Sequence, residues 1–362
     1  MNKKVLLRKI IRKFFKTKEQ INKEKYLQIL KKYEFLAKIV NPKDFIIQDL
    51  KKDKLLFFKK FDYKKLYKEK KLIYNEIISK IKIENLLPCN DKTLREYQLS
   101  AVEHAKNITD FFEENNLKYF ITSGTLLGAI RHKGFIPWDD DIDIGMLRAD
   151  YDRFMEVCKT DLGSEYFLQT PATEKGNADY GIAHVRLNGT SMVQEFRKNT
   201  ITHNGFTIDI FPYDNLPENK IVCFFYAKTF PIIKRICAKR MGYTPHPPKL
   251  AHRIILNVMY VLTRWIPLSF LHEKMMNYHV KHNKKQTKYV FPLSEWNYKA
   301  EKHLYTTVTD LSTLKFENEI FPVPKNYDLF LTEQYGNYME LPKDIESCYN
   351  RHRCISLDFG GY

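Results

Sequence analysis

The chain has 362 residues, 44% of them hydrophobic and 28% charged, with 60 Lys and Arg against 43 Asp and Glu. This length allows one large domain or two smaller ones, and the apolar content is enough for a buried core. The six cysteines are dispersed without a CxxC pair, which excludes a small disulfide-stapled scaffold and favours free thiols in a reducing compartment. No stretch reaches the roughly 20 apolar residues of a membrane span, so a membrane-spanning class is excluded as well.

Most of the net positive charge lies in the first 90 residues, which hold 26 Lys and Arg but 10 Asp and Glu. Residues 1–93 are therefore predicted to form a basic, mostly helical extension. Residues 5–16 place apolar side chains on one helical face and Lys and Arg on the other, which is typical of a helix on an anionic membrane surface. A helix packed on its own domain, with a solvated basic face, is equally open. Charged residues interrupt every apolar run, so no signal peptide is predicted.

Nucleic acid is not expected as a partner. Lysine in this extension is scattered among Leu, Ile, Tyr and Phe, without Arg clusters or a known binding motif. A solvated helical surface is the commoner explanation of such a pattern.

A candidate phosphate-binding turn follows a short predicted strand at residues 119–122. Small residues at positions 123–125 open a predicted helix at 126–131, and backbone N–H groups at a helix N-terminus suit a phosphate. Basic residues follow in the same loop, before the acidic stretch. The candidate donor-binding residues are Ser123, Gly124, Thr125, Arg131 and Lys133.

Residues 138–145 carry the strongest chemical signal, because four carboxylates occupy five positions within a predicted strand: Asp139, Asp140, Asp141 and Asp143. Strand alternation would send the first, third and fourth of these to one face. Unpaired buried charges of one sign cost on the order of several kcal/mol, and Mg²⁺ or Mn²⁺ with oxygen ligands is the usual solution. A solvated acidic turn is the alternative.

A nucleotidyltransferase-type site needs a third carboxylate on a neighbouring strand. Asp209 lies in the apolar run GFTIDIFP and is the best candidate, either as a metal ligand or as a paired structural group. Asp214, beyond Pro212, is weaker. Arg186 lies in an apparent strand at residues 181–186 and is either a donor-phosphate contact or a surface residue.

Two apolar segments at residues 221–240 and 254–268 have Lys and Arg at their edges. They predict a helical insertion at about residues 221–275. Contact with a membrane interface, a lid over the site and an ordinary pair of core helices all remain open.

Residues 122–151, TSGTLLGAIRHKGFIPWDDDIDIGMLRADY, closely resemble the signature of the LicD family, phosphotransferases similar to fukutin-related glycan-modifying enzymes. Asp209 in FTIDIFPYD matches the family's second acidic strand. Residues 94–99 resemble the family's beginning, and residues 321–328 and 335–342 resemble its ending. The resemblance covers about residues 94–356. It implies a catalytic domain at 94–362 with an α+β fold, a nucleotidyltransferase-like mixed sheet with flanking helices.

The resemblance also implies a reaction, in which phosphocholine or a related phospho-alcohol passes from a CDP-activated donor to a hydroxyl of a glycan or lipid-linked glycan. Lipopolysaccharide, teichoic acid and capsule are the expected acceptors, and the expected location is cytoplasmic, peripheral on the inner membrane face. Asp141, Asp143 and Asp209 would be the catalytic carboxylates and metal ligands. Asp139 would lie behind them, and Trp138 would pack to fix the loop.

Three other functions stay open at this point. A metal-dependent glycosyltransferase also uses a DxD motif, but would need neither the small-residue turn nor Asp209. The second is a glycan- or membrane-binding protein whose active site has lost its activity. The third is an RNA-directed nucleotidyltransferase.

Overall fold

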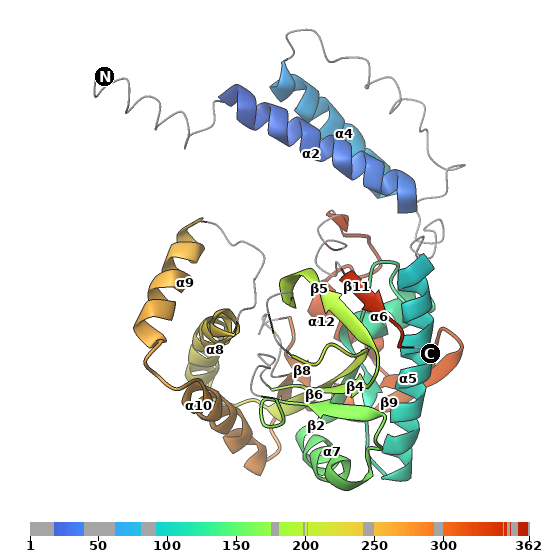
Figure 1. Cartoon of the computed structure of the whole chain (residues 1–362), viewed down its shortest axis with the longest axis vertical. Coiled ribbons are helices and arrows are strands. Elements are labelled where there is room, and N and C mark those ends of the chain that lie inside the picture. The colour runs from blue at the N-terminus through green and yellow to red at the C-terminus, as the bar shows by residue number, and fades with distance from the viewer. Residues whose placement is uncertain are drawn as a thin grey trace. The chain divides into compact units, whose positions relative to one another are not determined.

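The computed structural model describes residues 18–39, 62–80, 92–174, 181–197, 200, 202–241, 250–292, 300–342, 344–345, 348 and 354–360. The chain divides into two compact units, residues 1–91 with 341–348 and residues 92–340 with 349–362. In the first unit, α2 (Lys18–Ile39) and α4 (Tyr63–Lys80) pack side by side, as Figure 1 shows. The predicted membrane-surface helix at residues 5–16 lies outside the described residues, and the domain boundary expected at residue 93 stays a prediction.

The centre of the second unit is a mixed sheet, which confirms the predicted α+β class. Among the described residues it has seven strands, in the order β1-β2-β6-β4-β3, with β7 paired to the end of β6 and β8 paired to β7. Strands β2 and β6 are parallel, and the other pairs are antiparallel. The strands are β1 (Phe120–Ile121), β2 (Asp143–Leu147), β3 (Tyr166–Gln169), β4 (Ala183–Leu187), β6 (Thr207–Asn215), β7 (Tyr289–Pro292) and β8 (His303–Leu304).

Helices pack around this sheet through aromatic side chains. Helix α5 (Lys92–Glu114) buries residues at three- and four-residue spacing, because its apolar stripe faces the sheet. Tyr97 of α5 meets Phe206 edge-on at 4.8 Å, and Phe112 meets Phe154 edge-on at 5.4 Å between ring centroids. Further helical elements of this unit are α6 (Ser123–Arg131), α7 (Arg148–Asp161), η3 (Glu195–Arg197), α11 (Tyr305–Thr309) and α12 (Tyr327–Tyr335).

Two small antiparallel ribbons complete the second unit. Strands β9 (Leu311–Phe316) and β10 (Glu319–Pro324) form a hairpin, while β5 (Ser191–Gln194) pairs with the C-terminal strand β11 (Cys354–Asp358). Arg95 of α5 binds Glu317 in the hairpin turn through two hydrogen bonds of 2.7 Å. This bidentate ion pair ties the first helix of the unit to the hairpin.

The predicted insertion is helical. It consists of α8 (Lys220–Arg240), α9 (Leu250–Thr263), α10 (Leu268–Val280) and the short η4 (Lys281–Lys284), and Figure 1 shows its helices at one side of the sheet. Buried Cys237 of α8 packs against Leu268 and Leu271 of α10. Among the described helices, none combines the length and apolar character needed to cross a bilayer.

Candidate active site

The acidic stretch is a loop until Asp143, where β2 begins. The Tyr97 hydroxyl donates to the carbonyl of Asp140 at 2.8 Å, and Gln98 Nε2 donates to the carbonyl of Asp139 at 2.9 Å. Because the side chains of α5 bind these two loop carbonyls, the backbone of Asp139 and Asp140 does not pair with a strand of the sheet. The predicted strand alternation is therefore wrong before Asp143, and carboxylate oxygens of Asp139, Asp140 and Asp141 lie within 4.8 Å of one another.

The three predicted metal ligands nevertheless come together. Asp143 and Asp209 are register partners on the parallel strands β2 and β6, so their side chains project from the same face of the sheet. Carboxylate oxygens of Asp141, Asp143 and Asp209 all lie within 4.8 Å of one another, and each residue is buried or half-buried. Hard oxygen ligands at this spacing match what Mg²⁺ and Mn²⁺ prefer.

Two neighbours not foreseen from the sequence hold the Asp209 carboxylate. His184 Nδ1 lies 2.7 Å from Asp209 Oδ1, and the Thr207 hydroxyl donates to the same oxygen at 2.8 Å. Burial raises the pKa of Asp209, but His184, Arg186 and the Thr207 hydroxyl outweigh burial and bring the pKa below its usual value. Asp209 is therefore ionised at neutral pH.

The predicted phosphate turn lies directly against the carboxylates. Residues 123–125 form the first turn of α6 itself, where backbone N–H groups have no partner within the helix. A Cβ on Gly124 would lie 2.8 Å from Asp139 Oδ2, so a side chain here would displace that carboxylate. The Asp143 N–H donates to Thr125 Oγ1 at 2.8 Å, which fixes the start of β2 to the helix.

The three predicted cations take different places. Arg131 is at the far end of α6, about 12 Å of helical rise from Ser123, and donates to the carbonyls of Tyr338 and Glu340. Lys133 is exposed, with a φ of 61°. Arg186 is buried, donates to Gln169 Oε1 and the Gly205 carbonyl, and acts electrostatically on Asp209. Their contact with a donor phosphate stays a prediction.

Trp138 is buried, and its ring meets His132 edge-on at 6.5 Å. Burial and the charge of Arg131 lower the pKa of His132 to about 3, so this histidine is neutral. That Trp138 fixes the loop stays a prediction.

Two glutamines also reach the site from distant parts of the sequence. Gln194 on β5 donates to Asp140 Oδ2 at 2.7 Å, and Gln334 on α12 donates to the Ser123 hydroxyl at 3.3 Å. No local sequence signal marks either residue, since each acts through tertiary contacts alone.

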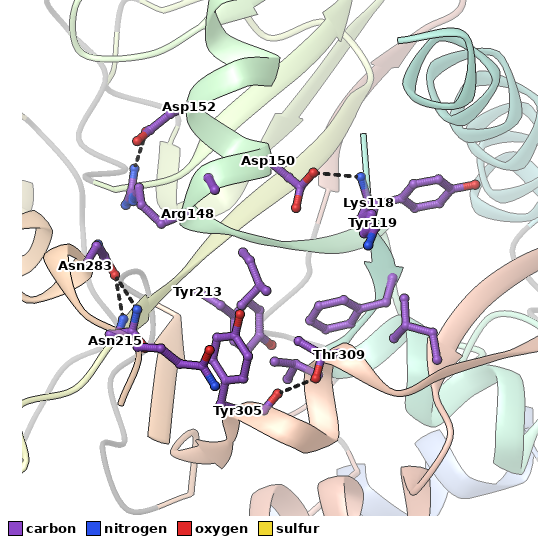
Figure 2. Close-up of a pocket in the computed structure, with 16 residues that line it drawn as sticks. Lys118, Tyr119, Arg148, Asp150, Asp152, Tyr213, Asn215, Asn283, Tyr305 and Thr309 are labelled. Carbon is purple, nitrogen blue, oxygen red and sulfur yellow. Dashed lines mark hydrogen bonds and ion pairs between the residues drawn. The ribbon is translucent and has the colours of Figure 1, made fainter. Parts of the chain in front are cut away.

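A cavity of about 530 Å³ lies at the opposite ends of β2 and β6, away from the carboxylates. Figure 2 shows its tyrosines, amides and charged side chains. Its wall includes Arg148, which is buried and bound to Asp214 by two hydrogen bonds of 2.7 and 2.8 Å. Asn283 donates to the same carboxylate, so these polar groups bind one another and support the end of β6.

The comparisons with known proteins agree with this geometry. Residues 116–238 match the LicD/FKTN/FKRP nucleotidyltransferase domain. The chain is 31% identical over 260 residues to the lipopolysaccharide cholinephosphotransferase LicD of Haemophilus influenzae, covering 70% of this chain and 93% of that protein. It is 32% identical over 77 residues to human ribitol 5-phosphate transferase FKRP, covering 21% of this chain and 14% of that protein. With Asp141, Asp143 and Asp209 gathered at one edge of a mixed sheet, the chain belongs to the LicD family.

Proposed function

We propose that this protein is a metal-dependent phosphotransferase that moves phosphocholine or a related phospho-alcohol from a CDP-activated donor to a hydroxyl of a cell-surface glycan. The observation that carries the proposal is the meeting of Asp141, Asp143 and Asp209 beside the first turn of α6. This pairing of an anion-binding helix end with a cation-binding carboxylate cluster fits a nucleotide diphosphate, which carries both phosphate charge and metal ligands.

The relatives support the class of reaction. The Haemophilus protein is named as a lipopolysaccharide cholinephosphotransferase, and the human protein as a ribitol 5-phosphate transferase. The two names share a phosphorylated alcohol as the transferred group. For this chain, lipopolysaccharide, teichoic acid and capsule are the proposed acceptors.

Mg²⁺ or Mn²⁺ is the proposed cofactor, held by Asp141, Asp143 and Asp209. When bound, it would neutralise charge on the donor's diphosphate and on the leaving CMP. Asp209 fits the role of a ligand better than that of a base, because its lowered pKa weakens its affinity for a proton. His184 and Thr207 both bind Oδ1 and so fix the orientation of the Asp209 carboxylate.

The first turn of α6 would bind the donor phosphates through the N–H groups of Ser123, Gly124 and Thr125. The absence of a side chain on Gly124 lets this turn lie directly against the Asp139 carboxylate. Arg131 and Lys133 are proposed to add positive charge near the phosphoryl oxygens. For this, the end of α6 and the residues after it would have to lie close to the bound donor. Arg186 acts on the site through Asp209, whose negative charge it stabilises.

The test is release of the nucleotide product from a panel of donors. Purified protein with Mg²⁺ or Mn²⁺ is incubated with CDP-choline, CDP-ethanolamine, CDP-glycerol, CDP-ribitol and UDP-sugars, with and without a glycan acceptor. We expect CMP from one CDP-alcohol, lost on chelation and restored by added metal. Asp143→Asn should lower turnover by about a hundredfold or more, while the matched control Asp161→Asn, at an exposed position of α7, should leave turnover unchanged.

Release of UDP in place of CMP would instead identify a nucleotide-sugar glycosyltransferase. Asp209→Asn separates the two reactions, because the phosphotransferase site needs the third carboxylate and the DxD glycosyltransferase does not. Turnover that survives both chelation and Asp209→Asn would refute the proposed metal site.

A further inference from the structure

Helix α9 presents a continuous apolar stripe to solvent. The stripe follows helical spacing at positions i, i+1, i+4, i+7 and i+8, and each of its side chains is at least half exposed: Ile254, Ile255, Val258, Val261 and Leu262. Trp265, directly after the helix, is 79% exposed. A soluble domain rarely leaves so many large apolar side chains together on its surface unless they bind something.

Helix α8 packs against one side of α9, so the stripe is not the unfilled side of a loose helix. Arg240 of α8 donates to the carbonyls of Thr263 and Ile266 at 3.0 and 2.8 Å and so fixes the end of α9. Lys239 of α8 lies over the ring of Tyr260 at 5.5 Å. One face of α9 therefore contacts α8, and the stripe of five aliphatic residues lies on the exposed face of α9.

Charge indicates what the stripe binds. Residues 220–285 contain 13 Lys and Arg but a single acidic residue, Glu273. At the end of α9, the Arg264 guanidinium lies 4.7 Å from the ring of Trp265. Within α10, Lys274 lies 5.4 Å from the ring of Phe270. Aromatic rings beside cations, next to an aliphatic stripe, are the composition of a helix in the headgroup region of an anionic bilayer.

We propose that the α8–α10 insertion docks the enzyme on an anionic membrane surface, with the α9 stripe buried among the lipid headgroups and acyl chains. The bilayer is favoured over a second copy of the chain because two such insertions, each strongly basic, would repel one another. This surface is separate from the carboxylate cluster and goes beyond the proposed function, since it concerns where the enzyme works and not the reaction. Its test uses no nucleotide, so it can fail independently of the proposed chemistry.

The experiment is co-sedimentation of the full-length protein with vesicles. One set contains equal parts of phosphatidylglycerol and phosphatidylethanolamine, and the other contains phosphatidylcholine alone. We expect binding to the anionic vesicles that weakens as salt is raised. Leu262→Asp should lower the partition coefficient at least about tenfold, since it places a charge on the face that the bilayer would bury.

The chain offers a closely matched control. Leu262 is 66% exposed on α9, and Ile320 is 65% exposed on the hairpin strand β10. Ile320→Asp makes the same chemical change at the same exposure, so it should fold equally well and bind vesicles like the wild type. Because both variants keep residues 1–91, any membrane contact by that segment is the same in the two.

The fluorescence of Trp265 measures how deeply the end of α9 enters the bilayer. Brominated acyl chains should quench its fluorescence, and Trp265→Leu should remove that component of quenching while vesicle binding persists. The proposal is overturned if Leu262→Asp and Ile320→Asp bind vesicles alike, if neutral and anionic vesicles bind equally, or if Leu262→Asp instead abolishes dimers seen by light scattering.

Discussion

Replacing His184 with leucine tests how the metal-binding carboxylates are held in place. The 2.7 Å contact between His184 Nδ1 and Asp209 Oδ1 is partly buried, and loss of such a partner behind a metal ligand costs about 10- to 100-fold in metal affinity. The Thr207 hydroxyl and the charge of Arg186 remain in the variant. We therefore expect a loss near tenfold, or about 1.4 kcal/mol of binding free energy.

The sign of the pH dependence follows from the same contact. His184 is one of the groups that lower the pKa of Asp209, so His184→Leu should raise it and let protons compete with the metal at higher pH. The affinity deficit of the variant should therefore grow as the pH falls from about 8 toward 5. Titration with Mn²⁺, followed by electron paramagnetic resonance of the free ion, measures this directly.

A second buried histidine provides the control. His104 of α5 contacts the Val185 carbonyl at 3.4 Å, on the strand that carries His184, and burial lowers its pKa to about 4. His104→Leu should weaken folding without changing Mn²⁺ affinity, and His184→Asn, which keeps a donor, should recover part of the loss. Equal affinity of His184→Leu and wild type across the pH range would refute the role of His184.

Two further substitutions test the loop and its support. Gly124→Val should lower turnover about a hundredfold with the fold intact by circular dichroism, because the new side chain displaces Asp139 Oδ2; normal turnover would contradict the close packing. Glu317→Gln should lower the free energy of unfolding at pH 7 by about 1–3 kcal/mol, because it removes the ion pair with Arg95. Burial raises the pKa of Glu317, but Arg95 and the Phe135 N–H lower it by more, so the pKa of the folded state lies below its usual value. The stability that the ion pair contributes is therefore present above about pH 4.3, and it is lost as the pH falls through the lowered pKa of the folded state. Urea unfolding at pH 7 and about 3 should therefore show a difference between wild type and variant that shrinks with acid.

Asp143 and Asp209 were accessible from the sequence because each is an acidic residue beside the apolar residues of a predicted strand, and the parallel strands β2 and β6 bring the two together. The path of residues 139–142 was not accessible. Local alternation predicts a strand there, and the hydrogen bonds that prevent it come from Tyr97 and Gln98, about 40 residues earlier.

His184 illustrates the same limit. Its place opposite Asp209 depends on β4 lying next to β6, and strand order is set by long-range packing. The helical insertion was predictable from its apolar segments, but its outward-facing stripe was not, since periodicity alone does not say which face a helix buries.

The support of the acidic loop from α5 bears on how short a working version of this enzyme can be. Residues 116–238, the segment that carries the family match, include all three carboxylates. They lack Tyr97 and Gln98, which bind the loop carbonyls, and β11, which pairs with the strand that bears Gln194. A truncated protein for expression should therefore begin before Lys92 and retain the chain through Asp358, because a fragment cut to the matched segment would carry the acidic residues without the groups that fix them.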